Sequence, residues 1–297
     1  MTKNPKARFL MCRPDHFGVS YAINPWMDPE SWTQESGTLV PASQREWMAL
    51  HHALTEVGGA IEAAHGVPGI PDFVFTANSA VVLDRKALLA RFRHPERQQE
   101  EPHVEAAFRG LQARGLIDRT ERLPKGVVLE GAGDCVWDQT RNHFWLGYGQ
   151  RSDVAARPIV EATFGVEAVA LELADPRFYH LDTALCALSG GDVLYVPDAF
   201  TETARARIAE RVAPQQRIEV GMADASRLAA NAVCVGNAVV MSACGAALRG
   251  QLEERGYRVI VTPLETFLRS GGAAFCLTLR LDNCSASPVR QARVTAA

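Results

Sequence analysis

Five short segments of the chain place reactive or hydrogen-bonding side chains beside turn residues rather than inside periodic apolar runs. A cysteine thiolate is a strong nucleophile, a histidine carries protons near neutral pH, and carboxylates hold cations. Each segment alone is a weak signal, because a lone histidine or a glycine-rich turn is more often structural. The segments are Asn24-Pro25-Trp26-Met27, Phe75-Thr76-Ala77-Asn78, Glu130-Gly131-Ala132-Gly133-Asp134, His180-Leu181-Asp182-Thr183 and Ser270-Gly271-Gly272-Ala273-Ala274-Phe275-Cys276.

The glycine-containing segment from Glu130 to Asp134 is a poor candidate for phosphate binding. It matches neither GxGxxG nor the P-loop pattern, and its two carboxylates would repel a phosphate. A planar guanidinium ion fits better, because carboxylates and amide oxygens can hold its three nitrogens by paired hydrogen bonds. Acidic groups together with a histidine and a cysteine therefore indicate chemistry on such a cation.

The seven cysteines are an odd number, and they include no CxxC pair. Disulfides and structural zinc are therefore not expected, and the sequence gives no sign of another metal or an organic cofactor. Most of the cysteines lie in apolar runs, as Cys234 does, where a thiol behaves as a small buried hydrophobic group. For any single cysteine this structural interpretation is the commoner one.

The composition predicts one large globular domain, since 47% of the 297 residues are hydrophobic and 22% are charged. A net charge of -3 without blocks of like charge argues against a nucleic acid or a membrane surface as partner and favours a small molecule. No apolar run approaches the roughly 20 residues that span a bilayer, and residues 1–8 lack the apolar part of a secretory signal. We expect a cytoplasmic protein and leave self-association into a homo-oligomer open.

A recurring unit of two short β-rich runs and a helix-like stretch positions these segments. Four copies are predicted, with strands at 73–75 and 79–83 and a helix at 103–111, strands at 127–129 and 144–147 and a helix at 154–164, strands at 181–188 and 192–196 and a helix at 202–212 capped by Thr201, and strands at 232–236 and 238–241 and a helix at 246–255.

The two ends of the chain are predicted to complete a fifth unit together. Residues 271–281 supply strands without a following helix, whereas residues 8–11 form a strand and residues 45–57 a helix. Repeats of this length suggest a propeller or another closed array. An ordinary α+β domain with several hairpins fits the periodicity about equally well. We expect one catalytic domain over residues 1–284 and a flexible polar tail over residues 285–297.

In this order along the chain, Asn78, Glu130-Gly131, His180-Leu181-Asp182-Thr183 and Cys276 after a glycine-rich loop resemble the motifs of the guanidine-modifying (pentein) superfamily. The resemblance covers nearly the whole chain. That superfamily includes arginine deiminases, dimethylarginine dimethylaminohydrolases, amidinotransferases and arginine dihydrolases. The resemblance implies an α/β fold, a five-bladed pseudo-symmetric propeller with the active site on its central axis, which agrees with the repeat pattern.

The resemblance also implies roles for the reactive residues. Cys276 would attack the guanidinium carbon to form a covalent thiouronium intermediate, and His180 would protonate the departing amine and then deprotonate a water molecule. Glu130 would orient His180, and Asp182, expected on the same face of a strand as His180, would bind the guanidinium nitrogens. Both the bound cation and His180 should favour the thiolate.

Four further residues match the family's positions for binding the substrate. Arg97 and Arg151 would hold its carboxylate, since an arginine fork pairs with a carboxylate through two bonds. Asn24, on an early loop expected to cover the site, and Ser270 are weaker candidates. The structural alternatives are a solvated arginine and, for Asn24, a simple turn before Pro25.

Asp182 and Asn78 distinguish the branches of the superfamily. Methylarginine hydrolases usually lack an acid in the place of Asp182, so its presence favours unmethylated arginine. Deiminases and amidinotransferases usually carry aspartate in the place of Asn78, and asparagine there resembles arginine dihydrolases. A neutral amide can also donate to a carbonyl oxygen, so a bound citrulline could be attacked again. Two rounds would give ornithine, carbon dioxide and two ammonia molecules.

Three alternatives remain at this level. One is a deiminase that stops at citrulline, and another is a dimethylarginine dimethylaminohydrolase or an amidinotransferase acting on another guanidino compound. The third is a binding protein without catalysis, since a ribosome-binding translation factor has the same propeller. Against the third, a binding module has no need to keep Cys276, His180, Glu130 and Asp182 together. Asp134 is interpreted as structural, and Cys12 has no neighbouring base to give it a role.

Overall fold

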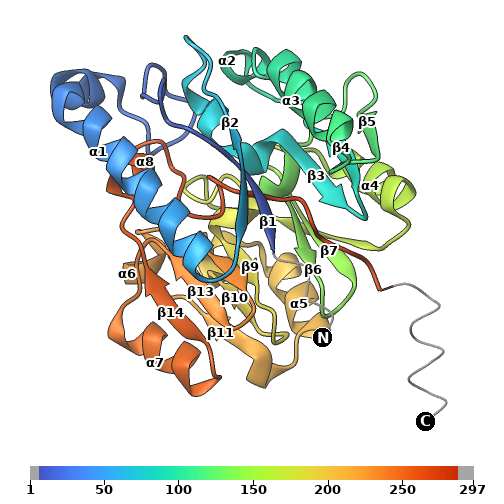
Figure 1. The fold of residues 1–297 in the computed structure, drawn as a ribbon. Helices are drawn as coiled ribbons and strands as arrows, with labels where there is room; N and C mark the ends of the chain where they lie inside the picture. Colours follow the sequence, from blue (N-terminus) through green and yellow to red (C-terminus); the bar gives the residue numbers. More distant parts are fainter. Residues whose placement is uncertain (1–6, 287–297) are drawn as a thin grey trace.

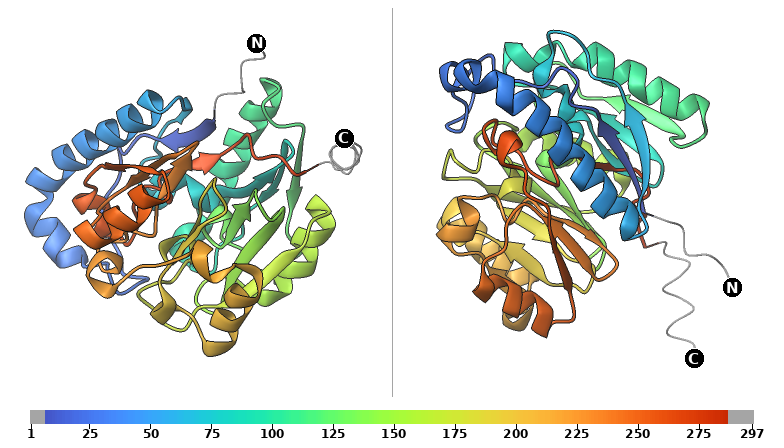
Figure 2. Two further views of the ribbon diagram at one scale, coloured as in Figure 1. Left: turned by 90° about the horizontal axis from the view of Figure 1, so that it is seen from below. Right: turned by 60° about the vertical axis from the view of Figure 1, so that its left-hand side comes forward.

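The computed structural model describes residues 7–286, and in that part of the chain the strands form five sheets of three strands each. The helices lie on the outside of the sheets, which surround a common axis (Figures 1 and 2). The predicted five-bladed α/β propeller is therefore confirmed.

Four of the blades repeat one pattern, in which an antiparallel hairpin is followed by an outer helix and a third strand parallel to the second. Parallel neighbours need a crossover connection, and the helix supplies it. The elements are β3 (Ala80–Leu83), β4 (Lys86–Leu89), α3 (Glu101–Ala113) and β5 (Arg119–Arg122); β6 (Cys135–Asp138), β7 (His143–Tyr148), α4 (Arg157–Phe164) and β8 (Ala168–Glu172); β9 (Leu185–Ala187), β10 (Val193–Tyr195), α5 (Glu202–Arg211) and β11 (Arg217–Glu219); and β12 (Val233–Val235), β13 (Ala238–Met241), α7 (Ala246–Glu254) and β14 (Arg258–Val261).

The fifth blade joins the two ends of the chain, as predicted. Strand β1 (Arg8–Cys12) pairs in parallel with β2 (Ala60–Ala64), and helix α1 (Pro29–Glu56) connects the two. On its other side β1 pairs antiparallel with β15 (Leu279–Arg280), with Leu10 opposite Leu279. Backbone hydrogen bonds between first and last strands therefore close the ring.

The outer helices agree with the sequence except at the N-terminus. The helix predicted at residues 45–57 is only the second half of α1, which begins at Pro29 and is capped by the Asp28 carboxylate. Thr201 does cap α5, accepting from the backbone N–H of Ala204 at 3.3 Å. Three further helices of one turn each lie near the site or between blades: α2 (Pro95–Gln98), α6 (Met222–Ala225) and α8 (Glu265–Leu268).

Several predicted strands are wrong. Residues 73–75 belong largely to a 3-10 turn (Pro71–Val74), residues 127–129 make only an isolated bridge between Leu129 and Arg91, and residues 181–183 form a 3-10 turn before β9. Of residues 271–281, only β15 is a strand. These runs are apolar because most of their residues are buried, and a short apolar run indicates burial without fixing the backbone conformation.

Three of the 3-10 turns pack together at the axis: Thr76–Ser79, Gly131–Gly133 and Leu181–Thr183. Their close approach depends on glycine. Gly131 has a φ of +64°, and an added Cβ there would lie 2.6 Å from the carbonyl oxygen of Ala77. Asn78 and Asp182 lie in two of these turns, and Glu130 directly precedes the third. The fold therefore gathers residues of three blades at one point.

The chain remains attached to the propeller just after the predicted domain end at residue 284. The Ser285 backbone N–H donates to Asp84 at 2.9 Å, and that of Ala286 donates to Asn142 at 2.6 Å. The rest of the predicted tail lies outside the described residues. Across residues 7–286, no helix combines the length and apolar character needed to cross a membrane.

Candidate active site

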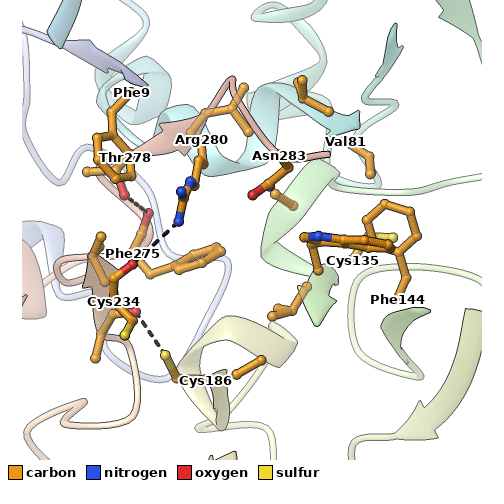
Figure 3. A pocket seen from close by; sticks show the side chains of 18 residues that line it. Phe9, Val81, Cys135, Phe144, Cys186, Cys234, Phe275, Thr278, Arg280 and Asn283 are labelled. Atoms are coloured by element: carbon orange, nitrogen blue, oxygen red, sulfur yellow. Dashed lines mark hydrogen bonds between the residues drawn. The ribbon is translucent and has the colours of Figure 1, made fainter. Parts of the chain in front are cut away.

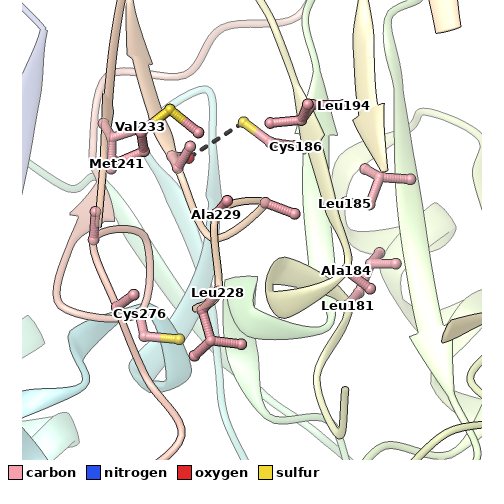
Figure 4. Close-up of a cluster of buried hydrophobic side chains, with 14 of the residues drawn as sticks. Leu181, Ala184, Leu185, Cys186, Leu194, Leu228, Ala229, Val233, Met241 and Cys276 are labelled. Carbon is pink, nitrogen blue, oxygen red and sulfur yellow. Dashed lines mark hydrogen bonds between the residues drawn. The ribbon is translucent and has the colours of Figure 1, made fainter. Parts of the chain in front are cut away.

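Cys276 lies in the buried loop between α8 and β15, with 2% of its surface exposed. It belongs to the largest apolar cluster, together with Leu228 and Ala229 (Figure 4). Burial and then the charge of Asp182 raise the pKa of the Cys276 thiol well above its usual value. These two effects favour the thiol form of Cys276, and a cation bound beside the sulfur would favour the thiolate.

The Asp182 carboxylate faces this thiol. Its Oδ2 accepts from Cys276 Sγ at 3.1 Å, whereas Oδ1 is buried without a hydrogen-bond partner. Burial raises the pKa of Asp182 to about 7. The expectation that Asp182 shares a strand face with His180 is wrong, because Asp182 lies in the 3-10 turn at Leu181–Thr183 and His180 directly precedes that turn. That tight turn still directs both side chains to the axis.

His180 and Glu130 form a buried pair, with His180 Nε2 at 2.7 Å from Glu130 Oε2. Because an ionised carboxylate can only accept, Nε2 carries a proton. Burial alone would raise the pKa of Glu130, but Arg151 and His180 outweigh it and hold this pKa well below its usual range. With the proton on Nε2, Nδ1 of His180 is an acceptor and faces the Asn78 amide nitrogen at 3.5 Å.

A second layer of bonds fixes this pair. Asp134 Oδ1 accepts from the Leu181 backbone N–H at 2.9 Å, next to His180 in the chain. Its Oδ2 accepts from Ser152 Oγ at 2.6 Å, and the same hydroxyl accepts from the Glu130 backbone N–H at 2.9 Å. Asp134 is thus structural, as its place in the sequence suggested.

Asn78 lies on the Nδ1 side of the His180 ring, and Arg97 lies beside Asn78. Arg97 is 3% exposed, and its guanidinium is paired with both carboxylate oxygens of Glu100 at 2.6 and 2.9 Å. It also donates to Asn78 Oδ1 at 2.9 Å, while Asn78 Nδ2 donates to the Glu130 carbonyl at 3.2 Å. Arg97 is therefore a fixed, buried cation whose position depends on Glu100.

Arg151 and the early loop close the opposite wall. Arg151 donates to Glu130 Oε2 at 3.0 Å and to the Ile23 carbonyl at 3.1 Å, and it stacks over the Tyr179 ring at 4.7 Å. Asn24 Nδ2 donates to the carbonyl of Ser270 at 3.0 Å. The early loop thus covers the site, as predicted, and all nine predicted residues lie in one region.

Sequence reasoning missed two buried polar residues of this region. Asp72 is 2% exposed and accepts from Tyr21 at 2.9 Å and from Ser270 Oγ at 3.2 Å, with Arg97 4.0 Å away. Asn231 is fully buried and contacts Cys276. Asp72 follows Pro71, but only the fold brings it to Ser270 and Arg97, and Asn231 sits within an apolar run without turn signals.

A separate cavity contains none of the nine predicted residues (Figure 3). Its lining is largely apolar and includes Val81, Cys135, Cys186 and Phe275, with Arg280 and Asn283 among the polar residues. Phe275 directly precedes the nucleophile candidate in the chain, but the cavity has no acid–base pair. In residues 7–286, no cluster of three or more histidine, cysteine and acidic side chains is suited to hold a metal ion.

Comparisons with known proteins agree with this arrangement. The chain is 41% identical to the bifunctional arginine dihydrolase/ornithine cyclodeaminase ArgZ of Synechocystis sp. over 92% of its own length, and it spans 37% of the length of that protein. The crystal structure of the substrate-bound N-terminal domain of ArgZ aligns with a TM-score of 0.87 and 40% identity, covering 94% of this chain and 99% of that domain.

Two further matches extend over most of this chain. The N(G),N(G)-dimethylarginine dimethylaminohydrolase of Mycobacterium tuberculosis is 34% identical over 92% of this chain and 85% of that protein. The family model described as eukaryotic N,N dimethylarginine dimethylhydrolase matches residues 13–282. With the propeller and the grouped cysteine, histidine and acids, these matches show that the chain belongs to the dimethylarginine dimethylaminohydrolase family, within the guanidine-modifying superfamily.

Proposed function

We propose that this chain hydrolyses the guanidinium group of L-arginine and releases ornithine, carbon dioxide and two ammonia molecules. The arrangement of Asp182 carries the proposal. One of its carboxylate oxygens accepts from Cys276 Sγ at 3.1 Å, and the other is buried without a partner. A guanidinium whose N–H groups donate to the Asp182 carboxylate has its carbon next to the sulfur.

Binding of the cation lowers the cost of ionising Cys276, because it adds a positive charge beside a carboxylate and a thiol. The thiol proton passes to His180 Nδ1, and the thiolate attacks the guanidinium carbon. His180 then returns the proton to the departing nitrogen, which leaves as ammonia, and a thiouronium remains on Cys276. Glu130, charged and bonded to Nε2, stabilises the transient imidazolium.

Water completes the first round. His180 takes a proton from the water, whose oxygen attacks the thiouronium carbon, and the C–S bond breaks to give bound citrulline. In a second round, Asn78 donates to the ureido oxygen of citrulline, and Cys276 attacks again. Ammonia is lost and a thiocarbamate remains on Cys276. Water attacks its carbonyl carbon, the C–S bond breaks, and the carbamic acid so formed splits at its C–N bond into ornithine and carbon dioxide. Over both rounds one arginine and two waters are consumed.

The charged walls of the site fit the two ends of an amino acid. Arg97 and Arg151 are proposed to hold the substrate carboxylate, and the buried Asp72 carboxylate its ammonium group. Asn24 and Ser270, bonded to each other and next to Asp72, are proposed to complete this end under the early loop. The arginine dihydrolase activity named for ArgZ supports the same substrate.

Hydrolysis of dimethylarginine is the second candidate, favoured by the family model and the mycobacterial relative. Methyl groups remove N–H donors, so an acid at position 182 has less to bind on a methylated nitrogen. Asp182 therefore favours unmethylated arginine. The cytoplasmic location remains a prediction from the sequence, and self-association into a homo-oligomer stays open.

Product analysis by mass spectrometry separates these activities. The purified chain is given arginine, citrulline or asymmetric dimethylarginine, each alone. We expect ornithine and two ammonia molecules per arginine. Accumulation of citrulline alone would refute the second round, and dimethylamine release without turnover of arginine would establish the second candidate. The Asn78→Asp variant, which keeps the side-chain shape but cannot donate when ionised, should stop at citrulline.

A further inference from the structure

Asn231 lies directly behind the nucleophile, and we propose that it is a further catalytic residue whose side-chain amide stabilises the Cys276 thiolate. The inference rests on the proposed role of Cys276. Asn231 is in the short segment between α6 and β12, and it comes from a different blade than the loop of Cys276. Its side chain therefore acts across two blades.

The hydrogen bonds of Asn231 fix the orientation of its amide. Its Oδ1 accepts from the backbone N–H groups of Cys276 at 3.1 Å and Ala273 at 3.2 Å. Because a backbone N–H can only donate, the oxygen must face these two groups. The nitrogen then faces Cys276 Sγ at 3.1 Å and the carbonyl of Asp182 at 3.0 Å.

The buried surroundings of the sulfur increase the stabilising effect of this donor on the thiolate. Asn231 is fully buried, and Leu228, Ala229 and Ala230 next to it in the chain are fully buried as well. The Asp182 carboxylate, on the other side, repels a thiolate. A neutral N–H donor in this buried site stabilises the anion without adding a charge.

Asn231 could instead be a structural clamp that only holds the loop of Cys276 and Ala273. Two substitutions separate the two roles. Asn231→Asp keeps an oxygen for the two backbone N–H groups but, when ionised, replaces the donor by a negative charge. Asn231→Ala removes both functions. A thiolate-stabilising role makes the aspartate variant the less reactive one, whereas a clamp makes the alanine variant the worse one.

The test measures alkylation of Cys276 by iodoacetamide between pH 6 and 9.5, followed by mass spectrometry of the peptide that contains it. We expect the rise in rate to move to higher pH, with rates about 10- to 100-fold lower in Asn231→Ala and lower still in Asn231→Asp. Asn237→Asp is the matched control, since Asn237 is exposed between β12 and β13 and, among the contacts described, its side chain bonds only to the Gly256 carbonyl at 3.3 Å. It should behave as the wild type.

Equal pH profiles in the wild type and Asn231→Asp, or a faster reaction in Asn231→Asp than in Asn231→Ala, would overturn the proposal. Alkylation needs no turnover of arginine, so a wrong substrate assignment leaves this result unaffected. If either variant fails to fold, the wild type with ¹⁵N-labelled asparagine decides. The Asn231 side-chain N–H protons, identified by their proximity to the Ala273 and Cys276 amides, should shift in Cys276→Ala, and unchanged shifts would count against the proposal.

Discussion

Replacing Glu130 by glutamine should reduce both turnover and stability, because this carboxylate is the junction of three buried contacts. Its oxygens accept from His180 Nε2 at 2.7 Å, Arg151 at 3.0 Å and the Arg93 backbone N–H at 3.1 Å. A glutamine oxygen can replace only part of this set, and its NH₂ then meets a donor. The charge that stabilises the imidazolium is also lost.

The magnitude follows from the burial of the pair. Breaking a buried ion pair from one side typically costs about 3–5 kcal/mol, which for a chain of this size lowers the melting temperature by roughly 5–8 °C. Loss of positioned acid–base catalysis lowers kcat by about 10²- to 10⁴-fold. The exposed Glu254 in α7, changed to glutamine, is the matched control and should be neutral.

The stability difference should also depend on pH in a defined direction. The pKa of Glu130 is depressed in the folded protein, so its stabilising charge is fully present above the ordinary glutamate pKa of about 4.3. It is lost as pH falls through the folded value. Calorimetry at pH 7 and in acid, together with ammonia release from arginine, measures both effects. A Glu130→Gln protein with kcat within threefold of the wild type and the same melting temperature would refute the reasoning.

Two further substitutions test the charged walls. Burial raises the pKa of Asp182 to about 7, so its ionisation lowers the stability of the folded protein as pH rises from about 4 to 7. Asp182→Asn should therefore melt several degrees higher than the wild type at pH 8 but not at pH 3. Its kcat/KM for arginine should fall about 10- to 100-fold. A lower melting point at pH 8 would contradict this. Arg97→Lys cannot keep two bonds to Glu100, so KM for arginine should rise at least about 10-fold in steady-state assays. The control is Arg85→Lys, at an exposed pair with Asp118, which should leave KM unchanged. Equal KM values in both variants would count against Arg97 as a carboxylate ligand.

Much of the site could be predicted from the sequence because its residues stand in short local motifs. Glu130, His180 and Cys276 each border a turn, and a turn signal is encoded by its immediate neighbours. The five-fold repeat likewise came from local periodicity, and β1 and β15 complete it as expected. The identity of the site residues was therefore easier to predict than their backbone conformation.

The remaining features depend on contacts between blades. The 3-10 turn that carries Asp182 is held by the bond from the Leu181 N–H to Asp134, which is 47 residues away in the chain. Asn231 sits in an apolar run and is identified only by its bonds to Cys276, 45 residues further on. No local pattern contains such partners.

The central claim is that Cys276 is the nucleophile that attacks arginine. Ammonia release from arginine by Cys276→Ala, compared with Cys186→Ala, tests it most directly, because both changes remove a buried thiol from the same apolar cluster. The account predicts no detectable release from Cys276→Ala and near wild-type release from Cys186→Ala. Normal release from folded Cys276→Ala would contradict it.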